Sequence, residues 1–289
     1  QIQIDFNRLC RLGKTSAAGS VMIIAQCASR YHYDEELARG MFLYEHRRCF
    51  DEIINYCNDL CYRGKLIPMR GAAPPTSQLP AMGYLHINGK CVQTSGGSRQ
   101  NQSEAAIIAD WICDNKSRLE AIYKGTRHST IDQIVGVVSP FGGQVAAITE
   151  ACIAKGLPVG KGDGELTVGT VHSLQGAERP IVIFSPAYSK HADGKFMDKR
   201  SSMLNVAVSR SKDSFLVFGD MDIFNPNDDG LPRGLLAKYL FAQPENALIF
   251  KSMPRHDLAQ VPEQFRYLLD AEAHDAFLLD VLATATKEV

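Results

Sequence analysis

The hydrophobic positions of the chain predict helices in some segments and fully buried strands in others. In residues 50–63 the apolar side chains recur with the period of one helical face. Four later runs are instead almost continuously apolar and rich in β-branched residues: 133–139, 166–172, 180–186 and 214–220. Runs of this kind are typical of strands in a parallel sheet that is covered by helices on both faces.

Helical patterns lie beside these strands. Segments 142–155 and 200–211 are predicted to be helical, and a longer helix is predicted over 102–123. That longer helix begins with a capping signal, because Asn101 offers a side-chain oxygen to exposed backbone N–H groups and Glu104 follows three residues later. The alternation of strands and helices predicts an α/β fold with an open, mainly parallel sheet.

The remaining segments give weaker signals. Proline, glycine and serine mark loops and a linker, and two stretches after the last strand have helical periodicity. We predict a short strand at 83–87, loops at 68–82 and 94–103, a linker at 225–232, and helices at 233–242 and 268–286.

The loops that follow the predicted strands are the places where we expect chemistry. In open α/β sheets, ligands bind at the carboxyl ends of the strands. The loops concerned are 139–144, 172–176 and 219–220.

Composition narrows the functional classes. The chain has 289 residues with 31 basic and 32 acidic side chains, a formal net charge of −1. This balance argues against a free-standing nucleic-acid binder with a strongly basic face, but it allows a local basic groove or one completed by another domain. Eight cysteines occur without a CxxC pair, which favours reduced thiols over a metal site. With neither a signal peptide nor an apolar run of membrane-spanning length, the expected location is cytoplasmic, without a membrane partner.

The triplet Gly13-Lys14-Thr15 resembles the end of a phosphate-binding loop. The full pattern needs a glycine five residues before the second glycine, and Arg8 stands there. It also needs a buried strand before it, and residues 1–7 are a poor candidate for one. We therefore do not assign the triplet to phosphate binding.

Three strand-loop segments, in order, resemble the motifs of superfamily I DNA and RNA helicases, in the branch of the nonsense-mediated-decay helicase. VGVVSPFGGQ (135–144) is similar to motif IV, TVGTVHSLQGAERPIVIFSPA (167–187) to motif V, and LNVAVSRSKDSFLVFGD (204–220) to motif VI. Upstream, LYEHRRCFDEIINYCNDLCYRGKL (43–66) resembles the arginine-bearing segment after motif III, and SRQNQSEAAII (98–108) resembles the stretch before motif IV.

The resemblance implies a RecA-like three-layer sandwich with a mainly parallel central sheet. In that family two such domains bind ATP between them, and the first carries the phosphate loop and the Mg²⁺ ligands. The chain resembles the second domain. We expect residues 1–36 to be a remnant or linker from a preceding motor domain, 37–224 to be the second RecA-like domain, and 225–289 to be a helical extension that starts a further domain.

The resemblance also implies which arginines act in catalysis. Arg210 would point across the cleft to the γ-phosphate, where a guanidinium stabilises the charge that develops during phosphoryl transfer. Without the motif, Arg210 would be a surface arginine at a helix end. Arg47 is the second candidate finger, and its neighbour Arg48 is the alternative that reaches phosphate.

Other motif residues are assigned to ligands in the same way. Glu178 and Gly176 are expected near the nucleotide, although Glu178 could instead form a surface ion pair with Arg179. Gln144 is placed with them, its amide either contacting nucleic acid or organising the cleft. The expected nucleic-acid contacts are Ser139, Thr170, His172 and Ser173, of which His172 could instead be a structural hydrogen-bonder.

The leading hypothesis is half of an ATP-dependent helicase or translocase. It would act on single-stranded nucleic acid, with DNA favoured over RNA as the substrate. ATP and Mg²⁺ would be bound mainly by the first RecA-like domain, and this chain alone would be inactive. Two alternatives stay open: a non-catalytic module that binds nucleic acid or a partner, and a nucleotide enzyme of another type, such as a nucleotide kinase.

Overall fold

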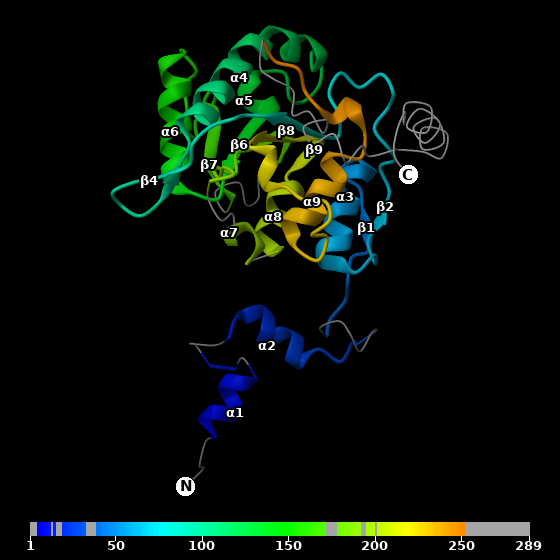
Figure 1. The fold of residues 1–289 in the computed structure, drawn as a ribbon. Coiled ribbons are helices and arrows are strands. Elements are labelled where there is room, and N and C mark those ends of the chain that lie inside the picture. The colour runs from blue at the N-terminus through cyan, green and yellow to red at the C-terminus, as the bar shows by residue number, and fades with distance from the viewer. Residues whose placement is uncertain are drawn as a thin grey trace, which may run out of the picture.

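The computed structural model describes residues 5–12, 14–15, 19–32, 39–171, 178–191, 195–199 and 201–251. Their main body is built around a five-stranded sheet in which every neighbouring pair of strands is parallel (Figure 1). The strand order is β3 (Met82–His86), β9 (Ser211–Gly219), β8 (Arg179–Phe184), β6 (Val135–Ser139) and β7 (Thr167–Thr170).

Helices cover both faces of this sheet. One face carries α4 (Gln102–Ile122), α5 (Ile131–Ile134) and α6 (Gly142–Ala154). The other carries α3 (Asp51–Cys57), which continues into the π-helical turn η1 (Asn58–Tyr62), together with α7 (Lys195–Asp198), α8 (Ser201–Val208) and α9 (Pro232–Leu240). The three layers explain why the strands are continuously apolar, and they confirm the predicted α/β class with a mainly parallel sheet.

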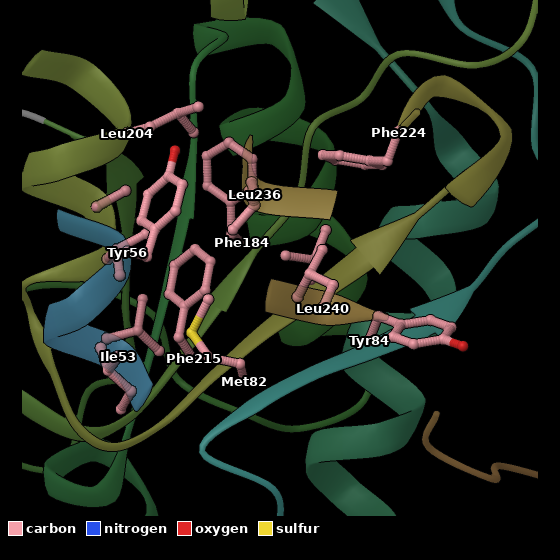
Figure 2. Packing of buried hydrophobic residues seen from close by; sticks show 14 of the residues in the cluster. Ile53, Tyr56, Met82, Tyr84, Phe184, Leu204, Phe215, Phe224, Leu236 and Leu240 are labelled. Carbon is pink, nitrogen blue, oxygen red and sulfur yellow. The ribbon is translucent and has the colours of Figure 1, made fainter. Parts of the chain in front are cut away.

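Two hydrophobic clusters hold the layers together. In the first, Phe184 and Phe215 from the sheet pack beneath Tyr56 of α3 and Leu240 of α9 (Figure 2). In the second, helix α4 packs on the opposite face, where the rings of its Trp111 and of Phe218 in β9 meet edge to face at 5.4 Å. Each fully buried side chain of this size contributes about 1.5–3 kcal/mol through burial alone.

Shorter elements lie outside this sheet. Helix α2 has no buried residue, and in Figure 1 the two N-terminal helices lie apart from the α/β body. The bounds are α1 Phe6–Arg11, α2 Val21–Ala28, β1 Glu45–His46 paired in parallel with β2 Ile67–Pro68, β4 Val92–Gln93 paired antiparallel with β5 Arg99–Gln100, η3 Met221–Ile223 and η4 Pro244–Asn246.

The predicted start of the long helix is confirmed. The Asn101 side chain accepts a hydrogen bond from the backbone N–H of Glu104 at 3.3 Å, and α4 begins at the next residue after Asn101. The loop predicted over 94–103 is wrong in part, because Arg99–Gln100 pairs with Val92–Gln93 as a hairpin. Strands of two residues are too short to leave a periodic signal in the sequence.

The end of the body also differs from the prediction. We predicted a boundary at residue 224, but Leu236 and Leu240 of α9 are fully buried in the first cluster. Beyond them Ala247 pairs with Tyr84 of β3 in an isolated bridge. The α/β body therefore continues past residue 224. The helix predicted over 268–286 lies outside the described residues.

The Gly13-Lys14-Thr15 triplet follows a helix. Helix α1 ends at Arg11, so the described residues just before the triplet are helical and no buried strand leads into it.

Among the residues that the structure describes, no helix is long and apolar enough to cross a membrane.

Candidate functional site

The amino ends of β8 and β9 bring two predicted site residues together. Glu178 directly precedes β8, and Arg210 directly precedes β9. The strands are paired with Arg179 opposite Ser211, and the carbonyl of Arg210 accepts a hydrogen bond from Arg179 at 3.1 Å. Strand register alone therefore makes Glu178 and Arg210 neighbours, although they are distant in sequence.

Arg48 reaches the same edge from the turn before α3. Its Nε lies 2.7 Å from Oε2 of Glu178, and its guanidinium donates to the carbonyl of Ser209 at 3.2 Å. Lys212 contributes a second cation, with Nζ 3.5 Å from Oε1 of Glu178. We call Arg48, Glu178, Arg210 and Lys212 the arginine cluster. Arg48 and Glu178 keep 37% and 34% of their side-chain surface exposed, so a ligand can reach them.

Arg210 is the unsatisfied member of this cluster. Its Nε is buried and has no hydrogen-bond partner among the described residues. Burial, and then the neighbouring charge of Arg48, lower the pKa of the Arg210 guanidinium. A buried donor without a partner costs about 1–3 kcal/mol. The cluster contains three cations and one carboxylate, so its net positive charge would attract an anion.

The carboxylate of Glu178 is held ionised by its neighbours. Partial burial acts to raise its pKa, but the charges of Lys212 and Arg48 outweigh that effect and lower it. The ion pair with Arg48 keeps the guanidinium of Arg48 at the edge of the sheet. The alternative that we left open, a pair between the side chains of Glu178 and Arg179, is not what forms: Arg179 instead donates to the carbonyl of Asp132 and the hydroxyl of Thr167.

The turn that carries Arg48 is held by hydrogen bonds between its backbone and two side chains, those of His46 and Arg70. The N–H of Cys49 donates to Nε2 of His46 at 3.2 Å, and Arg70 donates to the carbonyl of Arg48 at 2.8 Å. Burial raises the pKa of the Cys49 thiol to about 12, so this thiol is neutral and is no nucleophile. Burial, and then Arg48, lower the pKa of His46. His46 and Arg70 therefore hold the turn that positions Arg48, and the neutral Cys49 thiol adds no charge to the cluster.

Arg47, our first candidate in this segment, points elsewhere. It is 69% exposed and forms an ion pair with Glu45 at 2.6 Å. The structure therefore places Arg48, and not Arg47, beside Glu178 and Arg210. The sequence could not show which arginine reaches Glu178, because the two are adjacent and the turn in which they lie has no periodic pattern.

The carboxyl edge of the sheet holds two of the four predicted nucleic-acid contacts, Ser139 and Thr170. Ser139 ends β6 and Thr170 ends β7, and the two are paired across these strands. Ser139 is fully buried and its hydroxyl accepts from the N–H of Phe141 at 3.3 Å, whereas Thr170 is half-buried. His172, Ser173 and Gly176 lie outside the described residues, so their predicted contacts are not placed.

Gln144 is used inside the domain. It is fully buried, its Oε1 accepts from the N–H of Asn101 at 2.6 Å, and its Nε2 donates to the hydroxyl of Ser185 at 2.9 Å and to the carbonyl of Asn101 at 3.2 Å. Of the two roles that we considered for this amide, the geometry favours organisation of the strand ends. A direct contact with nucleotide or nucleic acid would require this network to open.

Glu104 completes that buried network and was not among the predicted site residues. Its carboxylate accepts from the hydroxyl of Ser185 at 2.5 Å, from the N–H of Ala187 at 2.9 Å and from Nδ2 of Asn101 at 3.0 Å. Burial raises its pKa to about 8 in spite of these donors. The capping signal at Asn101 drew attention to Glu104 in the sequence, but it did not indicate that the segment after β8 supplies two of its partners, Ser185 and Ala187.

The arginine cluster lies at the opposite edge of the sheet from the carboxyl ends of the strands. We expected chemistry in the loops that follow the strands, yet Glu178 and Arg210 precede β8 and β9. The arginine cluster therefore lies at the amino edge of the sheet, opposite the edge at which Ser139 and Thr170 end their strands.

Comparison with known proteins identifies the family. Residues 24–222 match the AAA_12 family, which is described as an AAA domain, and this range is more than half of the chain. The chain belongs to the AAA_12 family. Its relatives include Helicase sen1 of Schizosaccharomyces pombe, 34% identical over 32% of the chain and 6% of that protein. They also include a Regulator of nonsense transcripts 1 homolog of Arabidopsis thaliana, 26% identical over 57% of the chain and 12% of that protein.

The AAA_12 chain thus spans only a small part of these helicase relatives. Their names confirm the resemblance to superfamily I helicases, in the branch that the motifs indicated. Among solved structures, the C-terminal domain of a possible DNA helicase from a Lactobacillus is 12% identical, with a TM-score of 0.38 over 60% of this chain and 87% of that one.

The described part of the AAA_12 domain contains no group of three or more histidine, cysteine, aspartate or glutamate side chains that could hold a metal ion. All eight cysteines are free thiols.

Proposed function

We propose that this AAA_12 chain is the second motor domain of an ATP-dependent superfamily I helicase or translocase. The motor would act on single-stranded nucleic acid, with DNA favoured over RNA as the substrate. The single observation that carries the proposal is the arginine cluster, in which Arg210 has a buried Nε without a partner beside the guanidinium of Arg48. ATP and Mg²⁺ would be held mainly by the first RecA-like domain of the same protein, which faces this cluster across the cleft.

The chemistry of phosphoryl transfer explains why such a cluster is useful. Negative charge spreads over the equatorial oxygens of the γ-phosphate in the transition state, and planar guanidinium groups stabilise it with paired donors. Arg48 and Arg210 repel each other, and Glu178 balances only part of that charge. An incoming phosphate relieves the repulsion and supplies an acceptor to Arg210, so the cluster favours the charge that develops during catalysis.

The other edge of the sheet would hold the strand. Thr170 ends β7 and is half-buried, so its hydroxyl would contact phosphates or sugars without reading bases, whereas Ser139 at the end of the neighbouring β6 is fully buried and would first have to become accessible. Contacts of this kind suit a motor that steps over any sequence. His172 and Ser173, which follow Thr170 in the chain, are proposed for the same strand from the motif alone.

The chain alone should not hydrolyse ATP. Its sequence contains no complete phosphate-binding loop. The nucleotide would therefore be bound mainly by groups that another domain supplies.

The test is nucleic-acid-stimulated ATP hydrolysis, measured on this chain alone and on a protein that holds it together with its first motor domain. In the two-domain protein, Arg210→Ala should lower kcat by about 10³-fold or more. Arg210→Lys keeps a charge but loses the paired donors, so its kcat should also fall. Arg118→Ala is the matched control, because Arg118 is an exposed arginine on α4 whose guanidinium contacts only Gln78 among the described residues.

Two outcomes would contradict the proposal. Rapid ATP hydrolysis by this chain alone would show that it is not half of a motor. Unchanged turnover in Arg210→Ala would favour the alternative, a non-catalytic module that binds nucleic acid or a partner.

A further inference from the structure

Three aromatic rings contact one another at the carboxyl edge of the sheet. Phe141 follows β6, Tyr188 follows β8 and Phe196 lies in α7. The ring of Phe141 meets that of Tyr188 at 5.1 Å and that of Phe196 at 5.3 Å. We call these residues the aromatic strip. Phe196 is 40% exposed, Phe141 is half-buried and Tyr188 is buried beneath them, so two rings are accessible above an apolar base.

Buried polar contacts hold the strip in place. The N–H of Phe141 donates to the hydroxyl of Ser139, and the segment before Tyr188 is fixed by the bond from Ala187 to Glu104. After Tyr188, the N–H of Lys190 donates to Oδ2 of the buried Asp220 at 2.7 Å. Rings that are held this way lose little freedom when a ligand binds, which favours binding.

The β4–β5 hairpin brings a cation onto the strip. The guanidinium of Arg99 lies 5.1 Å from the centre of the Tyr188 ring. The hydroxyl of Ser98 accepts from the N–H of Gly143 at 2.9 Å, which ties the hairpin to the start of α6. A Cβ at Gly143 would lie 2.9 Å from the carbonyl oxygen of Arg99, so this close approach requires glycine.

Lysines surround the same surface. The N–H of Cys91 donates to the hydroxyl of Ser189 at 3.2 Å, which brings Lys90 close to Lys190, and both lysines are exposed. Lys195 is exposed next to Phe196. Asp222 pairs with Lys190 at 3.4 Å and offsets one of these charges. The whole chain has a net charge of −1, so this concentration of cations is local and not a consequence of composition.

Accessible rings among cations match one class of ligand. Single-stranded nucleic acid offers flat bases that stack on aromatic side chains and phosphates that pair with lysine and arginine. An apolar protein partner would use the rings but would bury the lysines without compensation. We propose that the aromatic strip and Arg99 form a base-stacking site for single-stranded nucleic acid, with Lys90, Lys190 and Lys195 along the backbone of the strand. The inference rests on the proposed function, since it adds base contacts to the strand expected at Ser139 and Thr170.

The test compares strands with and without bases. Fluorescence anisotropy would give the Kd of this chain for a short oligothymidylate, an oligouridylate of the same length, and an abasic DNA strand of the same charge. Phe196→Ala and Phe196→Leu should raise the Kd for the base-bearing strands roughly ten-fold, as expected for the loss of one stacked base. Both should leave the Kd for the abasic strand unchanged. Phe196→Tyr keeps a ring and should bind as the wild type does.

Two further variants complete the design. Arg99→Gln should weaken binding to all three strands, because it removes a charge as well as a stacking group. Phe42→Ala is the matched control, since Phe42 is 38% exposed, almost the same as Phe196, and lies in the segment before β1. The fluorescence of Trp111, measured during thermal unfolding, shows that each variant is folded.

The outcomes separate this inference from the proposed function. Wild-type binding that Phe196→Ala leaves unchanged, or weakens equally for the abasic strand, would overturn the stacking site and leave the proposed function intact. Absence of wild-type binding to every strand would overturn both the stacking site and the nucleic-acid part of the proposed function. A preference for one base-bearing strand that only the Phe196 variants abolish would support the site and show which of the two strands it binds more tightly.

Discussion

Glu104→Gln should remove a pH dependence from the stability of the domain. Glu104 is fully buried at the start of α4, and burial raises its pKa from an ordinary 4.5 to about 8. Between these two values the folded domain holds a proton on Glu104 that the unfolded chain has released. The free energy of unfolding therefore falls as the pH rises through this range, and the stabilisation is complete only below the unfolded pKa.

The size of the effect follows from the same two values. Each pH unit between them changes the free energy of unfolding by about 1.4 kcal/mol, so the wild type should lose roughly 2–3 kcal/mol between about pH 5.5 and 7.5. Glutamine has no proton to release. Both oxygens of Glu104 accept hydrogen bonds, so in either orientation the NH₂ group of the glutamine amide would face a donor of Asn101, Ser185 or Ala187. Two donors that face each other leave a hydrogen bond unmade, which lowers the free energy of unfolding by about 1–3 kcal/mol. The variant should thus be less stable at low pH, and the two stabilities should converge as the pH rises.

Urea unfolding at several pH values tests this prediction. Trp111 is the single tryptophan of the chain, and it is buried in α4, the helix whose first turn contains Glu104. Its fluorescence therefore reports on the unfolding of this helix. Glu150→Gln is the control, because Glu150 is exposed on α6 and its replacement should preserve the wild-type pH profile. A constant difference between wild type and Glu104→Gln across the range would refute the reasoning. It would show that Glu104 is ionised in the folded domain and that its three donors outweigh burial.

Two further predictions concern ion pairs. Arg48→Ala should lower the free energy of unfolding by about 1–2 kcal/mol, because it removes a partly exposed ion pair and the bond to the Ser209 carbonyl, whereas Arg47→Ala should change it by less than about 0.5 kcal/mol. Equal losses in urea unfolding would show that Arg48 is not the arginine held in the cluster. Asp198→Ala should cost about 3–5 kcal/mol, because it leaves Arg233 nearly buried without its partner at 2.8 Å. A wild-type Tm in this variant would mean that water reaches that guanidinium.

The elements that the sequence predicted well are those with a strong local reason. The strands β6, β8 and β9 were recognisable because helices cover both of their faces, which leaves no polar alternation. Helix α4 was recognisable from the acceptor at Asn101. By contrast, α9 follows a turn-rich segment that looked like a domain linker, and only the burial of Leu240 in the first core cluster assigns it to the body.

The candidate site was harder to predict, because its geometry depends on contacts between distant segments. Arg47 and Arg48 are chemically identical neighbours, and the choice between them is made by Arg70, which donates to the carbonyl of Arg48 and holds the turn. Gln144 looked like a ligand contact because it opens a helix after a strand. Its burial against Ser185 depends on how β6 and β8 are paired, which no local pattern records.

The two edges of the sheet are connected by its central strands, and this connection bears on how the proposed motor would work. Strand β8 (Arg179–Phe184) lies between Glu178 at the amino edge and Ser185 at the carboxyl edge, a distance of about 20 Å. Strand β9 (Ser211–Gly219) beside it lies between Arg210 and Asp220. Both strands are buried in the two hydrophobic clusters, so they cannot extend or shorten to transmit a signal. A phosphate that draws Arg210 toward the first motor domain would therefore move the aromatic strip by a rotation of the whole domain, and the strand bound there would move with it.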